Sequence, residues 1–509
     1  MNQLSSFWAL IDERAEQPAF VCKSFSAKRS ELRHASLRGA ALLASMGLKR
    51  GDTICVWLPD GGTWLQLLFA AAHIGVLIVP ISTRLRVEEA RYVVRTSGAK
   101  VIVIPTDFLG FDYAGSARLI QADTDCVEHV LEVAASEQFI VVDSALPVPQ
   151  ETGRLSDGLC TFSTSGTTGQ PKLAVHSQSS IARHGLNVAN RTDMAPGDVM
   201  LCGLSLYGVL GFVQMIGALA GGASCLFMQV FEAGRAAKLI ETEKVTHFFG
   251  SDGMFIPVLD IPGAKLSTWR CAGFAEFAGM ASIVVERAER EWGLRAFGVY
   301  GASECFALMA TGLPQSPAQV RKLAGGTSIS SEIEFRVVDV ESGIPLADGE
   351  RGELHIRGYN VMDGYLNNPK ATQAAFTADG WYRTGDLAYL EGERFVYLSR
   401  LKDGLRLSGY LVDPTEIEAF LATYEGVIDA QVVGVNRVGK GDVAVAFVRT
   451  RNANLAIADL LAFCKAGMAN YKVPKRIVAV VDYPSKDGPN GTKILKNKLR
   501  EMAEAVIPN

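Results

Sequence analysis

The sequence predicts an α/β protein with a large N-terminal domain, made of two doubly wound α/β subdomains plus a β-rich subdomain, and a small α+β C-terminal domain. Three observations support this prediction. Apolar β-type runs alternate with amphipathic helical segments up to Tyr300, strands and turns replace them after Gly325, and a compact α/β pattern begins at Lys402. A chain of 509 residues is too long to fold around a single hydrophobic core, so we expect two domains, residues 1–401 and 402–509.

The alternation predicts a definite order of elements. In the first subdomain we expect helices at 63–75 and 87–97, and strands at 52–57, 76–81 and 100–104. In the second we expect helices at 179–190, 233–243 and 280–292, and strands at 223–230, 245–249 and 296–300. The β-rich part has predicted strands at 333–338, 349–358 and 395–398. The C-terminal domain has predicted helices at 414–422 and 457–466, and strands at 430–435, 443–449 and 476–481.

One stretch, residues 199–231, contains no charged side chain and is long enough to span a membrane. Gln214 and several glycines interrupt its apolar character, and Gly221-Gly222 divides it in two. We therefore expect a buried helix, a turn and a strand here, and no membrane span.

Composition excludes several classes of protein. The net charge of −4 gives no basic surplus for a nucleic-acid partner, and 48% apolar residues indicate a folded, core-rich chain. The nine cysteines are scattered without a Cys-x-x-Cys pair, which favours reduced thiols over a disulfide framework or a zinc site. The first residues lack a signal-peptide layout. We expect a cytoplasmic protein that is a monomer or a homodimer.

A glycine- and hydroxyl-rich stretch lies between two apolar runs. Its candidate ligand-binding residues are Thr164, Ser165, Gly166, Thr167, Thr168, Gly169 and Lys172. Glycines let backbone N–H groups approach an anion, hydroxyls donate further hydrogen bonds, and the lysine adds positive charge, so a polyphosphate is the predicted ligand. An ordinary flexible linker has the same composition, and the spacing is not that of a Walker A loop.

The order Ser-Gly-Thr-Thr-Gly-x-Pro-Lys resembles the phosphate loop of the adenylate-forming family, which includes acyl-CoA synthetases and aryl-CoA ligases. The resemblance covers nearly the whole chain, with further motifs in the family's order. It implies activation of a carboxylic acid with ATP and Mg²⁺, followed by transfer to coenzyme A. Two alternatives stay open: loading of the acyl group onto a carrier-protein phosphopantetheine, and a nucleotide-binding relic without enzymatic activity.

A second motif follows the predicted strand that ends near Tyr300. The run Tyr300, Gly301, Ala302, Ser303 and Glu304 resembles the family's Tyr-Gly-x-Thr-Glu. The resemblance implies that Tyr300 packs on adenine and that Glu304 is catalytic and holds Mg²⁺. By itself the run could equally be the start of a helix capped by Ser303.

Upstream of this motif, a short run occupies the place of the family's glycine-rich adenine platform. Its residues are Gly273, Phe274 and Ala275.

Two groups farther along the chain complete the nucleotide site that the resemblance implies. Asp386, in Tyr-Arg-Thr-Gly-Asp, would accept both ribose hydroxyls, and Arg400 would contact the ribose or a phosphate. Alone, a Gly-Asp pair is usually just a turn. Lys402 falls at the family's hinge between domains, and Gly409 falls where a glycine lets the pantetheine arm of CoA pass.

Near the end of the chain, Gly491 to Lys496 resembles the family's lysine motif, with Thr492 in place of a glycine. Lys493 is then the catalytic lysine, which bridges the carboxylate and the α-phosphate, and Lys496 is the alternative. Any single lysine in such a position is more often a solvated surface group.

The acid substrate is predicted from segments expected near an acyl pocket. The candidate lining residues are Tyr207, Phe249, Gly250, Ser251 and Ala307. These segments are mostly apolar and contain no arginine or lysine that could pair with a second carboxylate. We therefore expect a hydrophobic monocarboxylic acid, either medium-chain fatty, alicyclic or aromatic.

Overall fold

The computed structural model describes residues 6–12, 14–21, 25–134, 138–164, 171–277, 279–401, 405–407, 410–412, 414–437, 441–451, 455–468, 470–488 and 491–507. Contacts divide the chain into two compact units. The first contains Met1–Glu334 and Ile356–Tyr382, and the second contains Phe335–His355 and Arg383–Asn509. The boundary expected between residues 401 and 402 falls inside the second unit and stays a prediction.

The first sheet of unit 1 has seven strands in the order β18-β8-β7-β4-β3-β5-β6. Its strands are β3 (Thr53–Val56), β4 (Leu77–Pro80), β5 (Val101–Pro105), β6 (His129–Val133), β7 (Gly158–Thr164), β8 (Lys172–Ser177) and β18 (Gly364–Tyr365). Strands β7, β4, β3, β5 and β6 are parallel, and β8 and β18 are added antiparallel.

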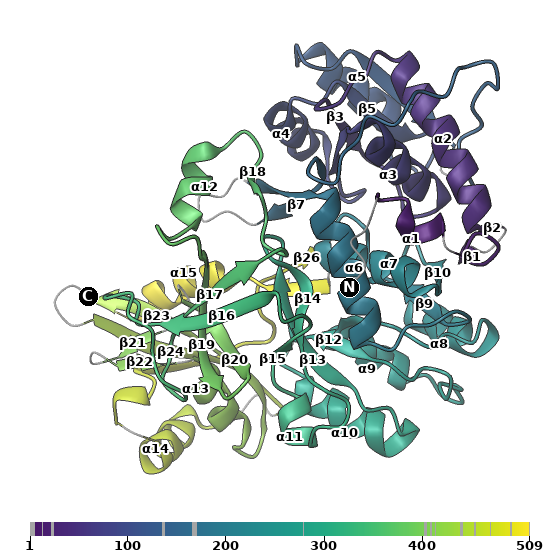
Figure 1. The fold of residues 1–509 in the computed structure, drawn as a ribbon. Helices are drawn as coiled ribbons and strands as arrows, with labels where there is room; N and C mark the ends of the chain where they lie inside the picture. Colours follow the sequence, from purple (N-terminus) through teal and green to yellow (C-terminus); the bar gives the residue numbers. More distant parts are fainter. Residues whose placement is uncertain are drawn as a thin grey trace. The chain divides into compact units, whose positions relative to one another are not determined.

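Helices cover both faces of this sheet (Figure 1). They are α2 (Arg29–Ser45), α3 (Gly62–Ile74), α4 (Val87–Ser97) and α5 (Tyr113–Ala122). Apolar residues of α4 and α5 share one core with β3, β4 and β5, while α2 and α3 pack together. The predicted elements of the first subdomain are confirmed, with ends that differ by one or two residues.

A second sheet of unit 1 has the order β2-β1-β10-β9. Its strands are β1 (Pro18–Val21), β2 (Ser26–Lys28), β9 (Val199–Cys202) and β10 (Ser224–Phe227), and helices α1 (Ala9–Asp12), α6 (Gln178–Arg191), α7 (Val209–Gly221) and α8 (Ala233–Thr242) accompany it. The charge-free stretch forms the predicted buried helix and strand, as α7 and β10, and begins with β9, which the sequence did not indicate. Within the described ranges, no helix is long and apolar enough to cross a membrane.

The remaining strands of unit 1 are β11 (Gly250–Ser251), β12 (Gly273–Ala275), β13 (Phe297–Ala302), β14 (Phe306–Thr311) and β15 (Gly325–Ser328). Strands β11, β12 and β13 are parallel, and β14 is antiparallel to β13 and β15. The helices around them are α9 (Asp252–Leu259), α10 (Ala281–Trp292) and α11 (Ala318–Arg321), while α12 (Pro369–Ala375) contacts β18 of the first sheet.

The strand expected at 245–249 is wrong. Only His247 forms isolated parallel bridges, to Met200 on one side and Cys271 on the other. The Thr246 hydroxyl accepts the N–H of Val199 at 3.1 Å, where a continuous ladder would use a backbone carbonyl. The side chain thus replaces the ladder hydrogen bond that would come before the bridge of His247 with Met200.

Unit 2 contains all or part of the β-rich strands β16 (Ile333–Val338), β17 (Gly352–Gly358), β19 (Tyr382–Glu391) and β20 (Arg394–Arg400). Of these, β16, β17 and β19 straddle the division between the units. Its C-terminal part has the strands β21 (Leu405–Leu407), β22 (Tyr410–Val412), β23 (Val427–Arg437), β24 (Gly441–Thr450) and β25 (Arg476–Ala479).

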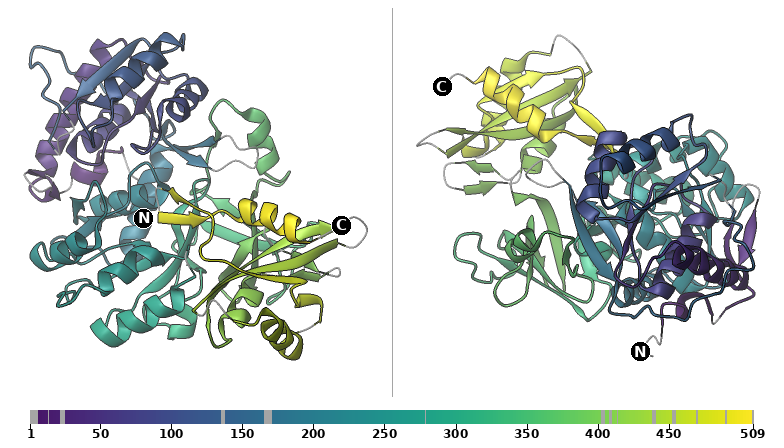
Figure 2. Two further views of the ribbon diagram at one scale, coloured as in Figure 1. Left: turned by 180° about the vertical axis from the view of Figure 1, so that it is seen from behind. Right: turned by 90° about the horizontal axis from the view of Figure 1, so that it is seen from above.

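One face of this C-terminal sheet packs on α13 (Pro414–Ala422) and α14 (Ile457–Gly467), and the other packs on α15 (Lys496–Val506), which is yellow in Figure 2. The predicted strands and helices of this part are confirmed. An unpredicted hairpin of β26 (Ser485–Gly488) and β27 (Gly491–Ile494) precedes α15.

Candidate active site

The predicted phosphate loop connects two antiparallel strands. β7 ends at Thr164 and β8 begins at Lys172, and these two residues are register partners. The prediction that two strands flank this stretch is therefore confirmed. Ser165, Gly166, Thr167, Thr168 and Gly169 lie outside the described residues.

Ser303 and Glu304 lie in the turn between β13 and β14, so the alternative interpretation of this motif as a helix start is wrong. Two contacts fix the turn beside the phosphate-loop strands: the Ser303 hydroxyl donates to the Ser163 carbonyl at 3.2 Å, and His176 Nε2 lies 2.8 Å from the Ser303 carbonyl. Burial lowers the pKa of His176 to about 3, so the neutral ring donates from Nε2.

The hairpin of β13 and β14 also requires a glycine at position 301. A Cβ atom at Gly301 would lie 2.2 Å from the Phe306 carbonyl oxygen, closer than any side chain could approach. Gly301 therefore allows the two strands to meet at the turn that presents Glu304.

A tyrosine that the sequence did not single out lies between the two charged residues of this region. The Tyr365 hydroxyl donates to Glu304 Oε1 at 2.9 Å, and Lys172 Nζ lies 4.3 Å from the centroid of the Tyr365 ring. Tyr365 follows Glu304 by 61 positions and lies in a strand of only two residues, so no periodicity or spacing could have indicated it.

The predicted adenine platform is β12, and its neighbour β11 contains two of the predicted acyl-pocket residues. Gly250 pairs with Phe274 and Ser251 with Ala275. Fully buried Asp252, directly after β11, accepts the N–H groups of Phe277 at 3.1 Å and Met280 at 3.0 Å. One carboxylate thus holds the loop that follows the adenine platform.

A second buried carboxylate, which the sequence analysis also missed, holds the segment that contains Tyr207. Asp60 Oδ1 accepts the N–H of Leu206 at 3.0 Å and faces the Ser205 hydroxyl at 3.5 Å. Burial raises the pKa of Asp60 to about 7, and the two donors only partly offset it. Burial also raises the pKa of Tyr207, whose phenol faces Ser163 of β7.

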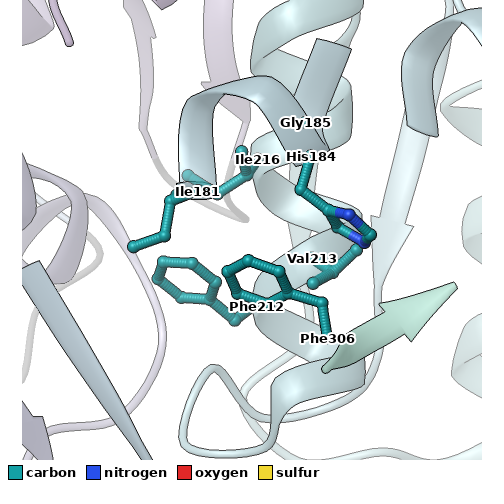
Figure 3. A pocket seen from close by; sticks show the side chains of 7 residues that line it. All are labelled: Ile181, His184, Gly185, Phe212, Val213, Ile216 and Phe306. Carbon is teal, nitrogen blue, oxygen red and sulfur yellow. The ribbon is translucent and has the colours of Figure 1, made fainter. Parts of the chain in front are cut away.

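A small apolar cavity lies between α6, α7 and β14 (Figure 3). Its lining residues are Ile181, His184, Gly185, Phe212, Val213, Ile216 and Phe306. It is too narrow to hold a water molecule, and none of the predicted acyl-pocket residues lines it. Phe249, Gly250, Ser251 and Ala307 are buried and Tyr207 is half-buried, and their role stays a prediction.

In unit 2 the structure brings the two predicted ribose-site residues together. β19 and β20 place Asp386 opposite Arg400, with Oδ1 and Nη1 at 3.0 Å. The Asp386 side chain is 3% exposed, so its carboxylate is largely shielded from water. The Thr384 hydroxyl accepts the N–H of Asp386 at 3.0 Å, and Arg400 donates to the Thr384 carbonyl at 3.1 Å.

The two candidate lysines differ in their surroundings. Lys493 lies in β27, where its register partner is Lys486. Lys496 begins α15, and its ammonium donates to Glu418 Oε1 at 2.5 Å and to the Val432 carbonyl at 3.3 Å. Lys496 thus has partners within its own domain. Lys402 and Gly409 lie outside the described residues.

Glu304 is chemically suited to hold Mg²⁺. Its partly exposed carboxylate is a hard oxygen ligand, and Mg²⁺ is commonly bound through one or two carboxylates together with substrate phosphates. The described residues contain no group of three or more His, Cys, Asp or Glu side chains that could hold a metal.

Comparison with known proteins shows the family to which the chain belongs. A family model for AMP-binding enzymes matches residues 7–366, and a model for the AMP-binding enzyme C-terminal domain matches residues 416–487. The chain therefore belongs to the AMP-binding enzyme family. The ATP-bound structure of MatB from Rhodopseudomonas palustris has the same fold, with a TM-score of 0.87, 22% identity, and coverage of 98% of this chain and 99% of that one.

Two curated relatives narrow the class. A mitochondrial medium-chain acyl-CoA ligase of Danio rerio is 31% identical over 92% of this chain and 82% of its own length. A 3-[(3aS,4S,7aS)-7a-methyl-1,5-dioxo-octahydro-1H-inden-4-yl]propanoyl:CoA ligase of Mycobacterium tuberculosis is 30% identical over 99% of this chain and 100% of its own length. Within its family the chain is an AMP-forming acid–CoA ligase.

Proposed function

We propose that this ligase activates a hydrophobic monocarboxylic acid, either medium-chain fatty, alicyclic or aromatic, and transfers it to coenzyme A. The observation on which the proposal rests is the arrangement of Lys172, Tyr365 and Glu304 beside the hairpin that flanks the phosphate loop. A cation and a carboxylate that contact the same tyrosine side chain suit a triphosphate with its divalent ion.

A carboxylate is a poor electrophile, so the reaction first converts it into a mixed anhydride with AMP, which a thiolate can attack. The acid's carboxylate attacks the α-phosphorus of ATP and pyrophosphate leaves; the CoA thiolate then attacks the acyl carbon and AMP leaves. Lys172 and the phosphate loop hold the β- and γ-phosphates, Asp386 accepts the ribose hydroxyls, and Lys493 offsets the charge that builds up at the α-phosphate. Bound at Glu304, Mg²⁺ supplies further positive charge against the phosphates.

The proposed acid class has two supports. Phe249, Ser251 and Ala307 are buried and uncharged, so they offer nothing to pair with a second carboxylate. The names of the two curated relatives give a medium-chain acyl group and a propanoyl group on a methylated, dioxo-substituted bicyclic ring, and neither name includes a second carboxyl group.

A pyrophosphate-release screen tests the proposal. At least one of octanoate, cyclohexanecarboxylate and benzoate should release pyrophosphate with ATP and Mg²⁺, while succinate and amino acids should not. Added CoA should yield the corresponding thioester. Release from dicarboxylates alone would overturn the acid class. Pyrophosphate release without thioester formation would favour a carrier protein as the acceptor.

The two lysines give the sharpest test of the catalytic assignment. Lys493→Ala should slow adenylation by about 100-fold or more, by analogy with other charge-stabilising groups. Lys496→Ala should instead weaken the packing of α15 through loss of the Glu418 contact, and adenylation should stay within a few-fold of the unsubstituted enzyme. The reverse pattern would transfer the catalytic role to Lys496.

A further inference from the structure

Tyr365 is fixed by its backbone beside the strand that begins with Lys172. β18 pairs antiparallel with β8, so that Tyr365 is opposite Ala174. On its other side the Tyr365 N–H donates to the Thr372 hydroxyl at 2.9 Å. The backbone of Tyr365 is therefore held on two sides.

The same segment also contacts the turn that contains Glu304. The Met362 N–H donates to the Glu304 carbonyl at 2.8 Å, three residues before Tyr365. Backbone and side chain of Glu304 thus both receive hydrogen bonds from this segment.

The Tyr365 side chain contacts the Lys172 ammonium with its ring face and the Glu304 carboxylate with its hydroxyl. The electron-rich face of a phenol ring attracts an ammonium group, as for Lys172, and its hydroxyl donates a charge-assisted hydrogen bond to a carboxylate, as for Glu304. Tyr365 itself is 7% exposed, so water screens these contacts weakly. A long lysine side chain otherwise samples many rotamers.

We propose that Tyr365 is a positioning residue, which holds Lys172 ready for the terminal phosphates of ATP and orients the Glu304 carboxylate toward Mg²⁺. The inference rests on the proposed function for the roles of Lys172 and Glu304. The role of Tyr365 follows from its contacts.

Two substitutions separate the two contacts. Tyr365→Phe keeps the ring face for Lys172 but removes the donor to Glu304, whereas Tyr365→Leu removes both. The chain offers a matched control in Tyr359, which has Arg183 4.6 Å from its ring centroid and accepts a hydrogen bond from Asn187 at 2.8 Å. Tyr359→Phe therefore perturbs the same kind of environment without touching the proposed site.

Calorimetric binding of ATP to the full chain, without acid and at several Mg²⁺ concentrations, measures positioning apart from turnover. Tyr365→Phe should raise the Mg²⁺ concentration needed for half-maximal ATP binding by about 3- to 10-fold. Tyr365→Leu should also weaken ATP binding at saturating Mg²⁺ by about 3- to 10-fold. Tyr359→Phe should change neither quantity.

Binding of AMP, which lacks the terminal phosphates, should be unchanged in every variant and thus reports an intact nucleotide site. If both Tyr365 variants bind ATP with the Mg²⁺ dependence of the unsubstituted protein, the positioning role is refuted and the proposed function stands. If the unsubstituted protein binds no ATP, the proposed function fails first. Should Tyr365→Leu fail to fold, Tyr365→Phe alone decides the question.

Discussion

The buried Asp60 carboxylate should make the enzyme more stable in mild acid than at alkaline pH. It is 4% exposed, and the described groups that contact it, the Leu206 N–H and the Ser205 hydroxyl, are uncharged. Burial raises its pKa from the ordinary 3.8 to about 7, because the hydrogen bonds from Leu206 and Ser205 only partly replace the lost hydration. Asp60→Asn keeps an acceptor for Leu206 and cannot ionise.

The size of the effect follows from the pKa. Between pH 3.8 and pH 7 the folded protein keeps a proton on Asp60 that the unfolded chain has lost, so stability falls as pH rises through this window. One pKa unit is worth about 1.4 kcal/mol, so the full loss is about 4 kcal/mol. About 2–3 kcal/mol of it falls between pH 5 and pH 8.

Urea unfolding of the unsubstituted protein and of Asp60→Asn, followed by tryptophan fluorescence across that range, measures the difference. The advantage of Asp60→Asn should grow with pH by the stated amount. Asp157 is the control of opposite sign, because its pKa is lowered by the Arg50 guanidinium, which donates to it at 2.7 Å. Asp157→Asn should lose stability by a constant amount above pH 5. A difference between the unsubstituted protein and Asp60→Asn that does not change with pH would refute the reasoning.

Two further predictions concern a glycine of α7, with a second glycine as its control, and a buried arginine. Gly211→Ala would place a Cβ atom 2.4 Å from the Ser205 carbonyl oxygen, so the segment that contains Tyr207 must shift. We expect kcat/KM for the acid to fall about tenfold. In the control Gly217→Ala, the new Cβ atom comes close only to the Val188 side chain, so stability should change while KM stays unchanged. Arg29→Ala removes the guanidinium hydrogen bonds of three buried carbonyls and should lower the free energy of unfolding by about 3–5 kcal/mol, measured by urea titration.

Much of the fold could be predicted because its signals are local. The apolar runs of β3, β4 and β5 and the helices between them have a clear periodicity that survives in the structure. The hairpin of β26 and β27 has no such signal: its strands read Ser-Lys-Asp-Gly and Gly-Thr-Lys-Ile, which are polar and do not alternate. The prediction of a strand at 245–249 was wrong for the opposite reason. Thr246 and His247 fit a strand pattern, but their side chains form hydrogen bonds with the backbone.

The charged residues of the candidate site could be predicted, but the groups that hold them could not. Lys172 and Glu304 stand in motifs of unusual composition, which a single sequence displays directly. Tyr365 is recognisable only when β18 is seen beside β8. Asp60 and Asp252 likewise look like ordinary turn residues until burial shows that their carboxylates hold backbone N–H groups.

This division explains why the activity is easier to predict than the acid. The reaction needs charges near phosphates, and charged residues in glycine-rich loops are conspicuous. The shape of an acyl pocket depends instead on how its walls are held. Asp60 and Asp252 each fix the backbone beside a predicted wall residue, Tyr207 or Ser251, without being wall residues themselves. Substitutions at these two carboxylates should therefore change the preferred acid more than exchanges between apolar wall residues of similar volume, which cores tolerate well.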